Sequence, residues 1–144
     1  MGVIYIDIDQ ALEIHNKTVL VSGGGLTQPL DTGRLESVLQ HIQNDDYYPT
    51  FEEKLNHLVF SSINFHCFAD GNKRIGISLG ANFLLINGYL AIASQFISEM
   101  ENISYHVAAG RIDKDFLLEI VTAMINDEYE ASEDLKLRII EMTG

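Results

Sequence analysis

The sequence contains no tryptophan, a single cysteine and only two prolines among its 144 residues. Cys67 has no partner for an internal disulfide, which favours a reducing compartment, and we therefore expect the protein in the cytoplasm. No run of about 18 apolar residues is present, so the sequence predicts no transmembrane helix. The opening residues, MGVIYIDIDQ, lack the basic start of a secretory signal peptide. These absences predict a protein without a membrane partner.

Basic residues are also scarce. Lysine and arginine number 9 against 21 aspartates and glutamates, which gives a formal net charge of −12. Duplex nucleic acid is bound by surfaces rich in basic side chains, which displace counterions from the phosphates. The composition therefore argues against a direct nucleic-acid partner. It leaves a local phosphate site open, because one loop can be basic on an acidic body.

The spacing of the apolar residues predicts an all-α fold. One clear stripe consists of Leu35, Val38, Leu39 and Ile42, which share one face of a helix. The pattern as a whole predicts a bundle of about six or seven helices, and the expected segments are 7–20, 32–43, 51–66, 73–86, 96–110, 114–127 and 133–144. The last of these is either a charged helix or a fraying tail, and YLAIAS (89–94) is expected to be short and extended.

Several residues predict where these helices begin and end. The expected caps and stops are Asp7 or Asp9, Asp31, Thr50 with Glu53, Gly88, Gly110 and Asp113. Gly76 and Gly80 lie four residues apart on one face of a helix, which predicts close approach of another backbone. The three glycines and the proline of SGGGLTQPLD (22–31) break the helical pattern and leave room for a small flap near residues 22–30. We expect one domain with its main part over 1–126 and with 127–144 as its C-terminal helix or tail.

The stretch FHCFADGNKRIG, residues 65–76, concentrates polar chemistry between two apolar helical segments. A helix that starts near Asn72 offers free backbone N–H groups and a partial positive charge. Gly71 permits a turn that points N–H groups at an anion, and Lys73 and Arg74 add two full positive charges. These features predict an anion site, most naturally for phosphate.

Asp70 and His66 add two further functions to this turn. A carboxylate beside a phosphate site is what Mg²⁺ requires, because phosphates and water supply its remaining ligands. A neutral histidine can accept a proton from a hydroxyl near pH 7. A base, a metal ligand and a phosphate cradle within nine residues outline phosphoryl or nucleotidyl transfer. The alternative without catalysis is a solvated turn before a capped helix, in which His66 donates a hydrogen bond to a free carbonyl group.

HCFADGNKR resembles the signature of the Fic/Doc superfamily, and a lysine before the arginine resembles its Doc (death-on-curing) branch. GGGLTQPLDTGRLESVLQHIQ, YYPTFEEK and FLLINGY are also similar to segments of Doc-type proteins, so the resemblance covers roughly residues 4–125. It implies a compact helical bundle. By this resemblance His66 is the general base, Asp70 holds Mg²⁺, Gly71 and Asn72 cradle phosphates, and Arg74 orients them. The flap that docks the target protein then consists of Gly23, Gly24, Gly25, Leu26 and Thr27.

The resemblance also bears on the reaction. Fic enzymes with glycine at the position of Lys73 transfer AMP from ATP, whereas Doc-type proteins bind ATP in the reverse sense and transfer the γ-phosphate. A toxin-type protein kinase is therefore implied, with ATP as co-substrate, a protein substrate such as elongation factor Tu, and a separate antitoxin as partner. The self-inhibiting glutamate motif of many Fic proteins has no convincing match here; SEMEN (98–102) has the wrong spacing. That absence is typical of the Doc branch.

Three other functions compete with the kinase. A Fic-type AMP or UMP transferase differs only in which phosphate is transferred. A non-catalytic interaction module is less consistent with the sequence, because a dead copy has no reason to keep His66, Asp70, Asn72 and Arg74 together. A metal hydrolase using His57, His66 and Asp70 is disfavoured, since the two histidines lie nine residues apart, on opposite helix faces.

Overall fold

The computed structural model describes residues 2–21, 32–64 and 72–144, and no strand occurs in these ranges. Their helices are α1 (Ile8–Val21), α2 (Thr32–His41), α3 (Phe51–Asn64), α4 (Asn72–Ile86), α5 (Leu90–Ala108), α6 (Lys114–Ile125) and α7 (Glu133–Thr143). The prediction of an all-α bundle is confirmed, and the C-terminal segment is a helix rather than a fraying tail. The predicted flap at 22–30 and the cap at Asp31 lie outside the described residues.

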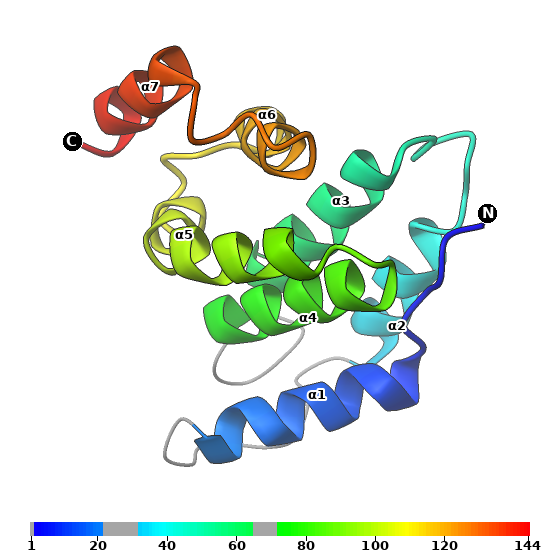
Figure 1. Ribbon diagram of the computed structural model, residues 1–144. Helices are drawn as coiled ribbons and strands as arrows, with labels where there is room; N and C mark the ends of the chain where they lie inside the picture. Colours follow the sequence, from blue (N-terminus) through cyan, green and yellow to red (C-terminus); the bar gives the residue numbers. More distant parts are fainter. Residues whose placement is uncertain (1, 22–31, 65–71) are drawn as a thin grey trace.

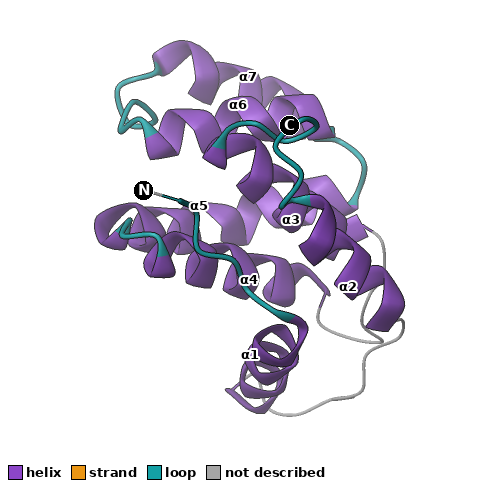
Figure 2. Cartoon of the chain, turned by 90° about the vertical axis from the view of Figure 1, so that its right-hand side faces the viewer, coloured by secondary structure: helices purple, strands orange, loops and turns teal. Residues whose placement is uncertain are grey.

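Helices α3 and α4 form the centre of the bundle (Figures 1 and 2). Helix α4 packs against α1, α3 and α5, while α3 also contacts α2, α5 and α6. In Figure 1, α1 lies on one side of this central pair, and α6 and α7 lie on the other. Both helices carry fully buried side chains, among them Leu58 and Val59 of α3 and Leu79 and Phe83 of α4. Their burial fixes α4, and with it the helix start that carries the predicted anion site.

Two glycines let α4 approach its neighbours closely. A Cβ atom at Gly76 would lie 2.7 Å from Ile63 Cγ1 and 3.4 Å from the Val59 carbonyl oxygen of α3. A Cβ at Gly80 would lie 2.6 Å from Phe96 Cζ of α5. The sequence predicts close approach of another backbone here, and among the three nearest atoms at each glycine only the Val59 carbonyl oxygen, at Gly76, is backbone. The nearest atoms belong mainly to side chains, because Ile63 of α3 and Phe96 of α5 occupy the space that a side chain at position 76 or 80 would fill.

The predicted helix caps in the described residues are confirmed. At the start of α1, Gln10 N donates to Asp7 Oδ1 at 2.8 Å, and Asp7 N donates to Gln10 Oε1 at 2.9 Å. Before α3, Glu53 N donates to Thr50 Oγ1 at 3.1 Å. Asp113 accepts a hydrogen bond from Phe116 N at 2.8 Å. These caps satisfy backbone N–H groups that a helix start leaves without partners.

Both predicted glycine stops have positive φ angles, 92° at Gly88 and 79° at Gly110. The expectation of an extended segment at 89–94 is wrong, because α5 runs without a break from Leu90 to Ala108. Ala93 and Phe96 begin the buried stripe of this helix, and Met100 and Ile103 continue it. Burial of a continuous stripe therefore outweighs the weak local preference of YLAIAS. Among the described residues, no helix combines the length and apolarity needed to span a membrane.

A buried lysine in the first turn of α3 contacts the loop that joins α2 to α3. Lys54 is 2% exposed, and its Nζ donates to the Ile42 carbonyl oxygen at 2.8 Å and to Asp45 Oδ1 at 2.7 Å. The Tyr5 ring centre lies 5.6 Å from the same nitrogen. A buried charge requires such partners. Lys54 therefore ties the segment before α1 and the 42–45 turn to α3.

Candidate functional site

The first turn of α4 carries two cations and no anion. Asn72 begins the helix, and the side chains of Lys73 and Arg74, which follow it, are exposed. This charge pattern opposes the helix dipole, which favours acidic residues at a helix start. By contrast, α3, α6 and α7 each begin with acidic residues. A bound anion would balance the positive charge that accumulates at the start of α4.

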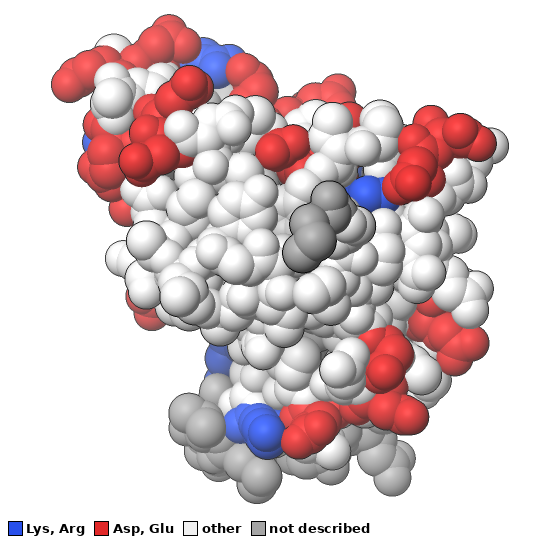
Figure 3. Space-filling model, turned by 45° about the vertical axis from the view of Figure 1, so that its right-hand side comes forward, with Lys and Arg blue, Asp and Glu red and all other residues white. Residues whose placement is uncertain are grey.

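Within the described parts of the chain, neither Lys73 nor Arg74 makes an ion pair or side-chain hydrogen bond. Most other lysines and arginines there have carboxylate partners, such as Arg138, whose Nη2 lies 2.7 Å from Glu119 Oε1. On the face shown in Figure 3, acidic side chains are spread widely and basic ones are few. Among the described residues, the two cations of α4 therefore have no acidic partner, and an external anion would supply one.

The helix beneath these cations is rigidly held. Ile75 and Leu79, which follow on the inner face of α4, are fully buried. On the side of α4 that faces α1, Thr18 Oγ1 lies 3.0 Å from Ser78 Oγ and 2.8 Å from the Ile14 carbonyl oxygen. A carbonyl only accepts, so Thr18 gives its single proton to Ile14 and receives that of Ser78. Packing and hydrogen bonding therefore fix the backbone from which Arg74 projects.

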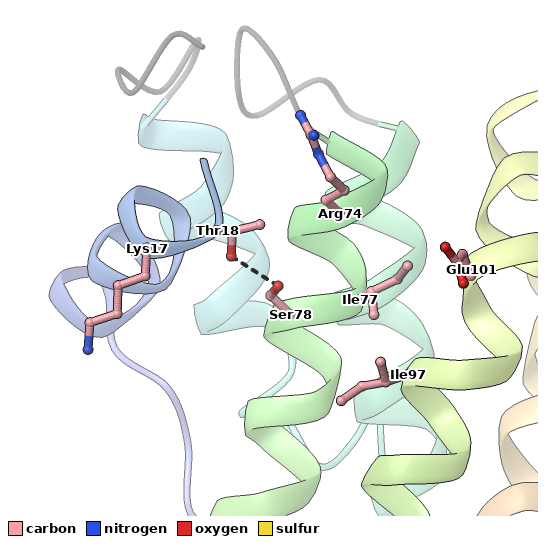
Figure 4. A pocket seen from close by; sticks show the side chains of 7 residues that line it. All are labelled: Lys17, Thr18, Arg74, Ile77, Ser78, Ile97 and Glu101. Carbon is pink, nitrogen blue, oxygen red and sulfur yellow. Dashed lines mark hydrogen bonds between the residues drawn. The ribbon is translucent and has the colours of Figure 1, made fainter. Parts of the chain in front are cut away.

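Arg74 lines one end of an open pocket of about 460 Å³ between α1, α4 and α5 (Figure 4). The lining residues are Lys17 and Thr18 from α1, Arg74, Ile77 and Ser78 from α4, and Ile97 and Glu101 from α5. Figure 4 shows Ile77 and Ile97 projecting into the space between α4 and α5, with Glu101 one turn further along α5. The pocket thus combines a cation at one end, an apolar middle and a carboxylate.

The structure brings three of the predicted site residues, Asn72, Lys73 and Arg74, onto a single helical turn. The other predicted residues, namely His66, Asp70, Gly71 and the flap residues Gly23, Gly24, Gly25, Leu26 and Thr27, lie outside the described residues. Their roles stay predictions. Sequence reasoning did not find the pocket residues Thr18, Ile97 and Glu101, because their proximity to Arg74 results from helix packing and leaves no local pattern in the sequence.

A second polar cluster surrounds His57 on α3. Its Nδ1 lies 2.9 Å from Lys114 Nζ and 3.2 Å from Tyr48 Oη, and its ring stacks on Tyr48 at 4.5 Å. An ammonium can only donate, so Nδ1 accepts and the imidazole proton sits on Nε2, which is buried and has no hydrogen-bond partner among the described residues. Burial, followed by the nearby charges of Lys114 and His41, lowers the pKa of His57 to about 4.

These contacts weaken the metal-hydrolase alternative. The Nδ1 lone pair of His57 is occupied by Lys114, and a cation 2.9 Å away opposes a second positive ion at this ring. In the described residues, no group of three or more His, Cys, Asp or Glu side chains is arranged to hold a metal ion. The cluster instead joins α3 to the start of α6 and to the loop before α3.

Comparison with models of protein families gives independent information about the chain. The model described as Fic/DOC family matches residues 5–84, which is 80 of the 144 residues. The matched range begins just before α1 and ends within α4, so it includes the polar stretch 65–76 and the first turn of α4. Among curated proteins, none matches this sequence.

Proposed function

The chain belongs to the Fic/DOC family, and from this premise we propose that it is a Doc-type protein kinase that transfers the γ-phosphate of ATP to a hydroxyl of a target protein. Family membership itself suggests a protein-modifying transferase that uses a nucleotide co-substrate. The observation that carries the proposal is the pair of cations, Lys73 and Arg74, which have no ion-pair partner among the described residues and lie on a helix start without acidic residues.

The donor set fits a magnesium–nucleotide complex. Lys73 and Arg74 supply positive charge for phosphate oxygens, and Arg74 is the residue type that grips two of them at once. Asp70 would hold Mg²⁺, since one protein carboxylate with phosphates and water is a common magnesium environment. When bound, the ion neutralises charge on the phosphate oxygens during transfer.

In the proposed reaction, His66 accepts the proton of the target hydroxyl as its oxygen attacks the γ-phosphorus. The bond between that phosphorus and the β,γ-bridging oxygen breaks, and ADP leaves. Gly71 and Asn72 bind phosphate oxygens from the backbone at the start of α4, while Arg74 orients the phosphate chain. The proton ends on His66 and the phosphoryl group on the target.

Lys73 favours phosphate transfer over AMP transfer. Its side chain occupies the position where AMP-transferring relatives have glycine, and it therefore reduces the space for an α-phosphate nested against the backbone. An AMP or UMP transferase remains the second candidate, because both reactions need the same base, carboxylate and arginine. Intact His66, Asp70, Asn72 and Arg74 disfavour a non-catalytic interaction module.

The proposed setting is the cytoplasm, where the enzyme acts as the toxin half of a toxin–antitoxin pair. A translation factor such as elongation factor Tu is a candidate target, and Gly23, Gly24, Gly25, Leu26 and Thr27 would form the flap that docks it. A separate antitoxin protein would restrain the activity. Induced expression alone should then arrest bacterial growth, and His66→Ala should abolish the arrest.

The direct test incubates the purified protein with Mg²⁺, γ-labelled ATP and a bacterial lysate. We expect label on a lysate protein, lost on chelation of Mg²⁺ and with His66→Ala. Ser132→Ala, which removes only the α7 cap, is the matched control and should keep full activity. Growth arrest that persists in His66→Ala without any label would overturn catalysis in favour of a binding module.

A further inference from the structure

The amine of Lys114, at the start of α6, contacts a neutral histidine. The side chain is partly buried, and its Nζ lies 2.9 Å from His57 Nδ1 and 5.5 Å from the centre of the Tyr48 ring. Within the described ranges, no carboxylate lies within ion-pair distance of this nitrogen. By contrast, three other lysines are each paired with a carboxylate, namely Lys17, Lys54 and Lys136. The amine at position 114 therefore lacks the contact that best stabilises an ammonium.

The groups around this amine favour its uncharged form. Partial burial lowers the pKa of Lys114, and the charge of Asp115 opposes that effect only in part. Tyr48 Oη lies 3.2 Å from His57 Nδ1, and the His41 ring centre lies 5.9 Å from that of His57. Neither a phenol nor an imidazole is anionic near neutral pH, so neither holds the ammonium as a carboxylate would. A lysine in such surroundings is nucleophilic, because only the uncharged amine has a free lone pair.

We infer that Lys114 is a modification site, at which a small acyl phosphate acylates the amine while His57 acts as the base. The ammonium first loses one proton to solvent. The Nζ lone pair then attacks the acyl carbon, an N–C bond forms, and the C–O bond to the phosphate breaks, so that inorganic phosphate leaves with the electron pair. His57 Nδ1, 2.9 Å away, accepts the second proton that the nitrogen loses and releases it to solvent. Partial burial of the amine favours a small donor over one on a large carrier.

This inference goes beyond the proposed function and does not depend on it. Acylation removes a positive charge and its contact with the Tyr48 ring, while one N–H remains to donate. The charge of Lys114 is one of the causes that lower the pKa of His57. That pKa should therefore rise in the acylated protein, and NMR titration of the His57 ring would detect the rise.

The test treats the purified protein with acetyl phosphate at about pH 7 and follows each lysine by mass spectrometry. Lys114 should be acetylated about tenfold faster than Lys17, a difference of about 1.4 kcal/mol in the barrier. Lys17 is a stringent reference, because its side chain is 72% exposed. Lys54 is 2% exposed and reports folding, since it should react only when the chain opens. A rate at Lys114 equal to or below that at Lys17 would overturn the inference.

His57→Gln tests the base. Glutamine accepts a hydrogen bond but takes up no proton near pH 7, so acetylation of Lys114 should fall to the rate of Lys17. Tyr48→Phe is the matched control, because it removes the hydroxyl beside His57 and keeps the ring, and Lys114 should stay within about twofold of its original rate. Equal losses in the two variants would overturn the role of His57, as would an unchanged rate in His57→Gln with Lys54 still protected. If His57→Gln unfolds and exposes Lys54, the ratio of Lys114 to Lys17 in the unaltered protein decides the inference.

Discussion

Gly80 of α4 faces Phe96 of α5 so closely that a Cβ atom at position 80 would lie 2.6 Å from the phenyl Cζ. Val59 Cγ2 of α3 would lie 2.8 Å from the same Cβ. Position 80 is therefore the point where α3, α4 and α5 meet. Because Arg74 projects from the same helix, the packing at this glycine sets where the proposed phosphate site lies relative to the pocket.

Gly80→Ala should destabilise the fold. The added methyl group overpacks a site surrounded by buried side chains. Contacts of 2.6–2.8 Å place the cost in the upper part of the range of about 1–3 kcal/mol, above the roughly 1 kcal/mol that alanine gains over glycine in a helix. Urea unfolding measures the difference. Gly80→Ala combined with Phe96→Leu should lose less than the sum of the single changes; additive losses would show that Phe96 is not the obstacle.

His57 should make stability depend on pH. Its pKa is about 4 in the folded protein, against an ordinary value of 6.5, so the unfolded chain binds more protons between these values. The free energy of unfolding therefore falls as pH drops from about 6.5 to about 4, by at most about 1.4 kcal/mol per pH unit from this residue. Carboxylates also contribute, so the wild-type curve is compared with that of His57→Gln. Parallel curves for the two proteins would contradict the prediction.

Arg74→Ala should lower transfer without lowering stability. The side chain is exposed and has no described partner, so the melting temperature should stay constant while kcat/KM falls about a hundredfold, as for loss of a preorganised donor at a developing charge. Arg111→Ala is the matched control, since Arg111 is exposed beyond the end of α5. An equal loss of activity in both variants would indicate a general charge effect.

The sequence predicts correctly those features that depend on residues close together in the chain. Thr50, Glu53 and Asp113 cap helices as predicted, because a cap involves residues three positions apart. The sequence also places Lys73 and Arg74 correctly at a helix start, because the start of a helix is determined by residues close to it in the chain. The sequence could not reveal that Ile97 and Glu101 approach Arg74, since that depends on how α5 crosses α4. The local pattern of YLAIAS predicts an extended segment wrongly, because its helical state depends on burial of the stripe that begins at Ala93 and Phe96.

Lys73→Gly tests the reason given for phosphate transfer. Removing the side chain frees space for an α-phosphate against the helix start, so the variant should gain transfer of AMP and lose transfer of phosphate. Arg111→Gly provides a control for loss of a cation, because Arg111 is exposed beyond the end of α5 and does not line the pocket. A variant that loses phosphate transfer and gains nothing would show that Lys73 supports catalysis without setting its type.

The most direct measurement of the central claim compares ATP labelled on the α-phosphate with ATP labelled on the γ-phosphate in the same lysate reaction. The kinase account predicts protein-bound label from the γ position alone, dependent on Mg²⁺ and on His66. Label from the α position alone would contradict it and establish nucleotide transfer by the same site.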